Sequence, residues 1–223
     1  MKTWKKILCF ALVVLLLVVA GLCIWQRDNL KAFFLYLSTD ADTIAEQRDQ
    51  LYQDQMKELE EELGGELPFV LPSKEQVDAL LNGEKDSEQV KQEMGIPSQP
   101  AKPQGSSVTK EDLVNQCVSE LYAYKAEVMG TLGGIKGSMM AQWTSLPAEQ
   151  RTTSKKMELG MAALRQCYAY EVTVDSNVQA CLNKYRGKLA AIGESTAAMD
   201  TLWQQYCAQK ESEKAYYMGK YLN

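Results

Sequence analysis

The chain begins with a short basic head followed by an uninterrupted apolar run from Ile7 to Trp25. As a helix, this run would rise about 28 Å, close to the roughly 30 Å hydrocarbon thickness of a membrane. Lysines precede the run and fewer basic residues follow it, a bias that places the N-terminus in the cytoplasm. We therefore predict a single-pass signal-anchor over residues 1–37, with residues 7–25 in the membrane and the bulk of the chain extracytoplasmic.

The same segment can also be interpreted as a secretory signal peptide. Residues 19–21 (Val-Ala-Gly) form a small-residue cleavage site after the apolar core. The apolar stretch continues to Trp25, which is long for a signal core and favours the uncleaved anchor. A lipoprotein signal is disfavoured because Leu22, not a small residue, precedes Cys23.

Residues 38–66 carry apolar side chains at near-helical spacing among acidic neighbours. Ile44, Leu51 and Leu59 follow this spacing, and Gly64-Gly65 ends the run. Because the apolar stripe is narrow, we predict an acidic stalk helix that is largely solvated. A dimeric coiled coil is the alternative, although the segment holds few heptads.

Two short segments follow the predicted stalk. Residues 67–96 contain a capping box at Ser73, a helix stop at Gly83 and a second short helix over about Ser87–Met94, which together predict a helical hairpin. Residues 97–107 contain three prolines and mostly polar residues, a composition typical of an extended linker. This linker is the clearest predicted domain boundary.

Apolar residues at helical spacing dominate residues 108–223. Two breaks interrupt them, one at Ser145–Pro147 and one at Ile192–Ser195. Short turns between long amphipathic helices make neighbouring helices antiparallel. We therefore predict a C-terminal antiparallel three-helix bundle over this range and an all-α fold for the chain.

Four glycines fall within two turns of the first of these helices, although each costs roughly 1 kcal/mol relative to alanine in a helix interior. Their spacing of i, i+3, i+4 and i+7 places them on one face: Gly130, Gly133, Gly134 and Gly137. We predict that this is a helix-packing face, covered by tyrosines of the last helix or methionines of the middle helix. A local helix break is the alternative. A phosphate-binding loop is disfavoured because glycine, not serine or threonine, follows Lys136.

Four cysteines lie in the predicted bundle: Cys117, Cys167, Cys181 and Cys207. An even number in an oxidising compartment is typical of disulfides. Folding the helices back at the predicted turns brings Cys117, Cys181 and Cys207 to a similar level, so one disulfide among these three is a candidate. Cys167 lies roughly 15 Å lower. The alternative is that the cysteines are small buried hydrophobic residues.

Charge is unevenly distributed along a chain whose net charge is −5. Residues 1–27 hold four basic residues and no acid, residues 40–95 hold 16 acids against 5 bases, and residues 96–223 hold 12 acids against 14 bases. None of these segments has the dense basic stripe that nucleic-acid backbones require, so no nucleic-acid partner is expected.

The chain has no histidine, which removes the usual general base and the commonest zinc ligand. No residues show the spacing of a catalytic, cofactor or metal site, and none is assigned such a role. The weak ligand candidates are Glu171 and Asp175, four residues apart on one helix, and Tyr217 and Tyr221, expected near the glycine face. Pairing with a lysine or arginine of a neighbouring helix is the ordinary role for such carboxylates.

Taken together, a membrane anchor, a linker and a helical head without catalytic residues favour a non-enzymatic protein. The layout is similar to that of small single-anchor bacterial envelope proteins. We expect an extracytoplasmic protein-interaction or envelope scaffold module with a protein partner in the envelope. The alternative is a module that binds a small ligand, a cation or a cell-wall glycan through the Gly130–Gly137 face and the C-terminal tyrosines.

Overall fold

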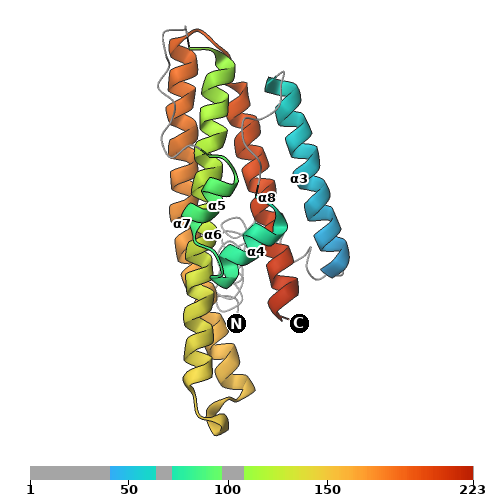
Figure 1. Cartoon of the computed structure of the whole chain (residues 1–223), viewed down its shortest axis with the longest axis vertical. Helices are drawn as coiled ribbons and strands as arrows, with labels where there is room; N and C mark the ends of the chain where they lie inside the picture. The colour runs from blue at the N-terminus through green and yellow to red at the C-terminus, as the bar shows by residue number, and fades with distance from the viewer. Residues whose placement is uncertain (1–40, 64–71, 97–107, 223) are drawn as a thin grey trace, which may run out of the picture. The chain divides into compact units, whose positions relative to one another are not determined.

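A computed structural model describes residues 41–63, 72–96 and 108–222 (Figure 1). Over these residues the chain forms six α-helices, one short 3-10 helix and no strand, which confirms the predicted all-α class for this part of the chain. The predicted anchor over residues 7–25 and the predicted linker over residues 97–107 lie outside the described residues. None of the described helices is both long enough and apolar enough to cross a bilayer.

The described helices belong to two compact units. Among the described residues, the smaller unit consists of α3 (Ala41–Leu63) up to Leu59 and of α8 (Ala197–Leu222) from Gln204 onward. The larger unit extends from Glu60 to Trp203 and therefore includes the first turns of α8.

In the larger unit, α6 (Lys110–Ser145) and α7 (Thr153–Ala191) form a long antiparallel pair. The 3-10 helix η1 (Ala148–Gln150) lies in the turn between them. A capping box at Thr109 starts α6, and the Thr152 hydroxyl caps α7 by accepting a hydrogen bond from the Lys155 amide. Figure 1 shows the two helices side by side along their length.

Two short helices, α4 (Lys74–Asn82) and α5 (Ser87–Glu93), pack against α6. Both start with a capping box, at Ser73 and at Asp86, and α4 ends at Gly83, whose φ of 73° is in the left-handed region that favours glycine. These helices form where the sequence predicted a short helical hairpin. The prediction did not include their docking on α6.

The core of the larger unit lies where α6 meets its neighbours, at the half of α6 remote from the α6–α7 turn. Buried apolar side chains come from every packed helix: Val77, Leu80, Leu81, Val90, Met94, Leu113, Val114, Cys117, Val118, Val174, Val178, Leu182, Leu189, Met199 and Leu202. Burying each large side chain of this kind contributes about 1.5–3 kcal/mol.

In the smaller unit, α3 packs one face on α8. Ile44 and Ala215 are buried together with Tyr216 packed against them. Gln55 and Gln205 are buried polar residues whose amides bond across the two helices: Gln55 Nε2 donates to the Gln205 carbonyl at 3.4 Å, and Gln205 Nε2 donates to the Gln55 carbonyl at 3.3 Å. The acidic segment is thus a helix, but it is not solvated on all sides as a stalk would be.

Candidate functional site

The glycine face of α6 is covered at one edge and open at the other. A Cβ at Gly133 would lie 2.4 Å from the Leu80 carbonyl oxygen, so α4 approaches the backbone of α6 at this point. A Cβ at Gly130 would lie 4.0 Å from the Ser87 Cβ, whereas Gly134 and Gly137 have nothing within 4 Å. The element that covers this face is therefore the α4–α5 hairpin.

This cover differs from the expected one, which was a tyrosine of α8 or a methionine of α7. Met157 and Met161 of α7 are 67% and 47% exposed. Tyr217 lies in the smaller unit, with its ring edge-on to that of Tyr216 at a centroid distance of 5.0 Å, and the side chain of Tyr221 lies outside the described part of the chain. The prediction failed because the sequence does not tell whether a hairpin before a linker folds back onto the helix after it.

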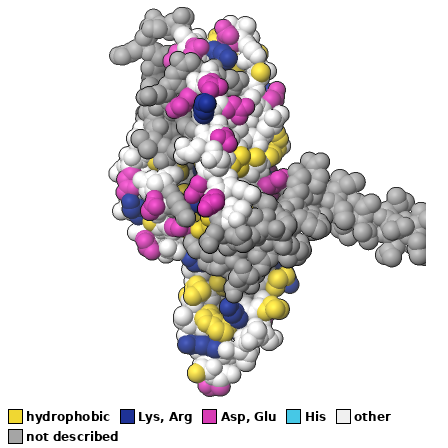
Figure 2. All heavy atoms as spheres, turned by 90° about the vertical axis from the view of Figure 1, so that its right-hand side faces the viewer, with side chains coloured by type: hydrophobic (Ala, Val, Ile, Leu, Met, Phe, Trp, Pro, Cys, Tyr) yellow, Lys and Arg dark blue, Asp and Glu magenta, His cyan; other side chains and the backbone are white. Residues whose placement is uncertain are grey.

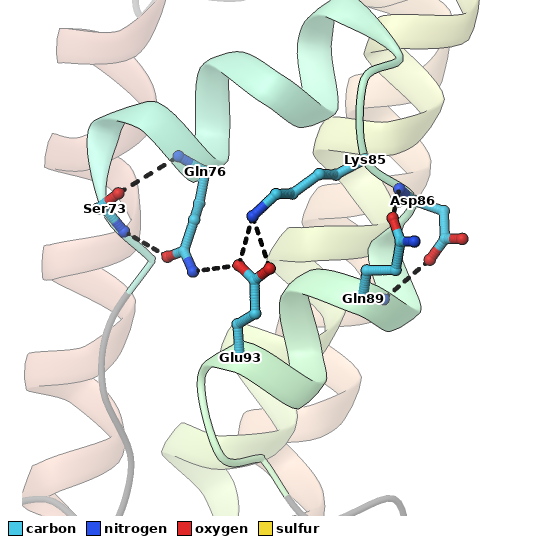
Figure 3. Close-up of polar contacts among 6 residues, drawn as sticks. All are labelled: Ser73, Gln76, Lys85, Asp86, Gln89 and Glu93. Atoms are coloured by element: carbon cyan, nitrogen blue, oxygen red, sulfur yellow. Dashed lines mark hydrogen bonds and ion pairs between the residues drawn. The ribbon is translucent and has the colours of Figure 1, made fainter.

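An ion pair and hydrogen bonds hold the α4–α5 hairpin together (Figure 3). A further ion pair connects this hairpin to α6. Glu93 accepts hydrogen bonds from Gln76 at 2.6 Å and from Lys85 at 2.6 Å, and these two donors hold its pKa below the ordinary value. Lys91 Nζ donates a hydrogen bond to Glu127 Oε1 of α6 at a distance of 2.6 Å. Burial would lower the pKa of Lys91, but its bonds to Glu127 and Glu88 outweigh burial and raise it.

Beyond the part of α6 that the α4–α5 hairpin covers, none of the described residues of the larger unit forms a third layer on the α6–α7 pair. None of the residues from Gly134 to Thr173, a range that the structure describes throughout, is buried. We call this part of α6 and α7, with the turn between them, the hairpin end. Its most exposed large apolar side chains are Met140, Met157, Met161, Tyr168 and Val172.

Basic residues accompany these apolar side chains. The hairpin end holds five basic residues and three acidic ones: Lys136, Arg151, Lys155, Lys156 and Arg165 against Glu149, Glu158 and Glu171. Figure 2 shows apolar and basic side chains together at the lower end of the view, where α6 and α7 meet in Figure 1. An exposed apolar patch with a positive charge is typical of an interaction surface.

The two carboxylates that the sequence suggested as weak ligand candidates have interactions of their own in the structure. Glu171 and Asp175 lie on α7, and both are half-buried and engaged in polar or electrostatic interactions. No group of three or more cysteine, aspartate, glutamate or histidine residues in the described ranges could hold a metal ion.

Two of the three candidate disulfide cysteines lie on the packed α6–α7 pair. Cys117 of α6 is fully buried, Cys181 of α7 is half-buried, and each thiol shifts the pKa of the other. The Cys117 Sγ also lies 3.7 Å from the Met199 Sδ of α8. Cys207 belongs to the smaller unit, and all four described cysteines are free thiols.

Three charged or polar side chains surround this thiol pair. Glu120 pairs with Lys184 and accepts a hydrogen bond from the Tyr185 hydroxyl at 3.0 Å. Burial would raise the pKa of Glu120, but its bonds to Lys184 and Tyr185 lower it, and burial next to Glu120 raises the pKa of Tyr185. The neighbouring thiol of Cys181 and burial raise the pKa of Cys117, whereas the neighbouring thiol of Cys117 lowers the pKa of Cys181. Cys181 is therefore the more acidic thiol.

Sequence reasoning missed Glu120, Lys184 and Tyr185, although their spacing was visible. Glu120 follows Cys117 by three residues, and Lys184 follows Cys181 by three, so each pair shares a helix face.

The charges next to Cys181 lead to a testable prediction about its reactivity. In a Lys184→Gln variant, the negative charge of Glu120 near Cys181 is no longer balanced by the lysine, so the pKa of Cys181 rises. Because less of the Cys181 thiol is then ionised, its alkylation by iodoacetamide at pH 7.5 slows by about threefold. In a Glu120→Gln variant the same alkylation becomes faster. Peptide-resolved mass spectrometry separates Cys181 from the other cysteines, and equal rates in both variants and the parent protein would contradict this account.

Comparisons with known proteins assign no family. No protein-family model matches the sequence, and no solved structure matches it. A stretch of 96 residues, which is 42% of this chain, is 35% identical to "Histone acetyltransferase KAT6B" of Mus musculus. The match spans 5% of that protein's length, so it does not extend that protein's activity to this chain.

Proposed function

We propose that the protein is a non-enzymatic, membrane-anchored module outside the cytoplasm whose helical bundle docks another envelope protein. The observation that carries the proposal is the hairpin end, where α6 and α7 bury no residue between Gly134 and Thr173. The other halves of the same helices bury side chains under α4 and the first turns of α8. A two-helix layer with apolar side chains exposed is complete only when a third element covers it.

The composition of the hairpin end supports a helix as its occupant. Gly134 and Gly137 leave open space above the backbone of α6, which permits another backbone to come close. Methionines such as Met157 and Met161 are adaptable side chains that occur often at surfaces that bind helices. The hairpin end has more basic than acidic residues, so its net positive charge is complementary to an acidic surface on a partner. We therefore propose an acidic amphipathic helix of a partner protein.

Designed peptides can test this proposal with the full chain in nanodiscs. One probe is an amphipathic helical peptide with leucines along one face and glutamates beside them, and its control carries lysines in place of the glutamates. We expect the glutamate peptide to bind, and the affinity to fall at least about tenfold in a Met157→Glu/Met161→Glu variant, since hot-spot residues each contribute more than 1 kcal/mol. Fluorescence anisotropy measures both affinities.

The matched control is Ile192→Glu, which changes an exposed apolar residue just past the opposite end of α7 and should leave binding unchanged. Equal binding of the lysine peptide would contradict the acidic partner. Equal losses in the Ile192 and methionine variants, or no binding of the glutamate peptide, would contradict the docking surface.

A further inference from the structure

Three of the exposed large apolar side chains at the hairpin end are methionines. Met140 is 46% exposed, Met157 is 67% exposed and Met161 is 47% exposed. We propose that these three thioethers are a modification site, where oxidation to methionine sulfoxide by a peroxide switches off the docking of the partner helix. The loss of docking rests on the proposed function, whereas the modification itself does not.

Other methionines of the larger unit are protected from solvent. Met94, Met129 and Met199 are at most 6% exposed, and Met139 is half-buried. A thioether has no proton to lose, so access of the oxidant determines how fast each methionine reacts. The exposed and the protected methionines belong to one compact unit, so their oxidation rates can be compared within a single sample.

Two side-chain hydrogen bonds give the register of α6 and α7: Asn177 Nδ2 donates to the Tyr124 hydroxyl at 2.8 Å, and the Tyr170 hydroxyl donates to Thr131 Oγ1 at 3.4 Å. The two bonds lie seven residues apart on each helix, so the register is the same at both levels. Nine further residues along α6 lead to Met140, and nine residues back along α7 lead to Met161. These two methionines therefore lie at one level of the pair, and Met157 lies one turn from Met161 on the same face of α7.

Met140 shares a face of α6 with two of the glycines. It follows Gly133 by seven residues and Gly137 by three. α4 lies against Gly133, whereas nothing lies within 4 Å of a Cβ at Gly137. A partner helix that docks on this face beside α4 would therefore cover Met140.

The modification transfers one oxygen atom to sulfur. The sulfur lone pair attacks one oxygen of hydrogen peroxide, so a sulfur–oxygen bond forms while the oxygen–oxygen bond breaks. The hydroxyl group on the sulfur passes its proton to the departing hydroxide, which leaves as water. The sulfur has lost two electrons and the peroxide has gained them. A methionine sulfoxide reductase reverses the change with two thiols, which become a disulfide while the oxygen leaves as water.

Oxidation changes the character of the docking surface. A thioether is apolar and adaptable, whereas the sulfoxide oxygen is a polar acceptor that needs a hydrogen-bond donor. The apolar face of a docked helix offers no such donor, so docking would bury the sulfoxides without partners. We expect the affinity for the glutamate peptide to fall by at least about tenfold on oxidation.

The modification is tested by treating the full chain in nanodiscs with hydrogen peroxide and digesting samples taken at successive times with trypsin. One tryptic peptide, residues 157–165, holds Met157 and Met161, and another, residues 126–136, holds Met129. Tandem mass spectrometry should show Met157 and Met161 oxidised about tenfold faster than Met129. Met140 should be oxidised together with the exposed pair.

The switch is tested by fluorescence anisotropy with the glutamate peptide. Binding should weaken after oxidation, stay weak with dithiothreitol alone, and return when methionine sulfoxide reductases A and B are added with dithiothreitol. The arm with dithiothreitol alone separates methionine oxidation from disulfide formation. The matched control is Met140→Leu/Met157→Leu/Met161→Leu, which keeps the surface apolar and should bind the peptide equally well before and after peroxide.

Oxidation of Met129 or Met199 as fast as that of Met157 and Met161 would overturn the modification site. Unchanged peptide affinity after complete oxidation of the parent protein would overturn the switch, and so would a leucine variant that loses binding on oxidation as the parent does. If the glutamate peptide fails to bind before oxidation, the docking surface fails and the switch with it. The oxidation rates decide the modification site independently of that result, so the two failures are distinguishable.

Discussion

A Gly133→Ala substitution is expected to destabilise the docking of the α4–α5 hairpin by about 2 kcal/mol. The added Cβ would lie 2.4 Å from the Leu80 carbonyl oxygen and 3.2 Å from the Leu81 Cα. Both neighbours are backbone atoms of α4, so no side-chain rotation relieves the contact. Overpacking typically costs about 1–3 kcal/mol, and a backbone clash places the cost at the upper end. The better helix propensity of alanine offsets up to about 1 kcal/mol of it.

Hydrogen exchange of the full chain measures this effect locally, which matters because two compact units need not unfold together. Amides of α4 and α5 should exchange about 30-fold faster in the Gly133→Ala variant, since 1.4 kcal/mol corresponds to a factor of ten. The matched control is Gly134→Ala, one residue further along α6 and open to solvent, which should stabilise α6 by up to about 1 kcal/mol. Similar exchange in the two variants would show that α4 does not lie against Gly133.

The local signals in the sequence predicted much of the secondary structure. Ser73 and Thr109 start helices through capping boxes, and Gly83 ends α4 in the left-handed conformation. These signals depend only on nearby residues, so they can be recognised without knowing the fold. The break predicted at Ser145–Pro147 also lies between α6 and α7, as a turn at this proline requires.

Long-range packing was not predictable in the same way. A glycine face shows that something approaches closely, but α4, α7 and α8 all offered suitable side chains. In α3, the packed positions Ile44, Arg48, Gln55 and Leu59 share one helix face, yet two of these four residues are polar. A search for apolar periodicity therefore found only a narrow stripe and favoured a solvated helix. A buried arginine is recognisable from sequence only if its acidic partner is known, and Glu213 lies far along the chain.

An Arg48→Met substitution is expected to weaken the packing of α3 on α8 by about 3 kcal/mol. Arg48 is 4% exposed, and its guanidinium lies 3.6 Å from Glu213, 2.9 Å from Asp49 and 4.2 Å from the ring centroid of Tyr216. Burial would lower the pKa of Arg48, but Glu213 and Asp49 raise it, so the guanidinium stays charged. Removing one partner of a buried ion pair typically costs about 3–5 kcal/mol, because the other charge stays buried alone.

The lower end of that range applies because Glu213 keeps one polar neighbour. The Tyr52 hydroxyl donates a hydrogen bond to Glu213 at 3.0 Å, and this bond does not involve Arg48. The ion pair itself, at 3.6 Å, is longer than a hydrogen bond. Amides of α3 should therefore exchange about 100-fold faster in the Arg48→Met variant. A Gln53→Met variant, which places the same side chain at an exposed position of α3, should exchange as the parent protein does.

A double variant separates the loss of the ion pair from the loss of packing. In Arg48→Met/Glu213→Leu no charge remains buried in the interface, and replacing a buried ion pair by apolar residues of similar size is often neutral or stabilising. We therefore expect most of the lost protection of α3 to return. If the double variant is as unstable as Arg48→Met alone, the aromatic contact to Tyr216, rather than the charge of Glu213, determines the contribution of Arg48. In that case the buried arginine would hold α3 through its cation–π contact with Tyr216, and an Arg48→Lys variant would keep part of the protection that Arg48→Met loses, because an ammonium also interacts with an aromatic face.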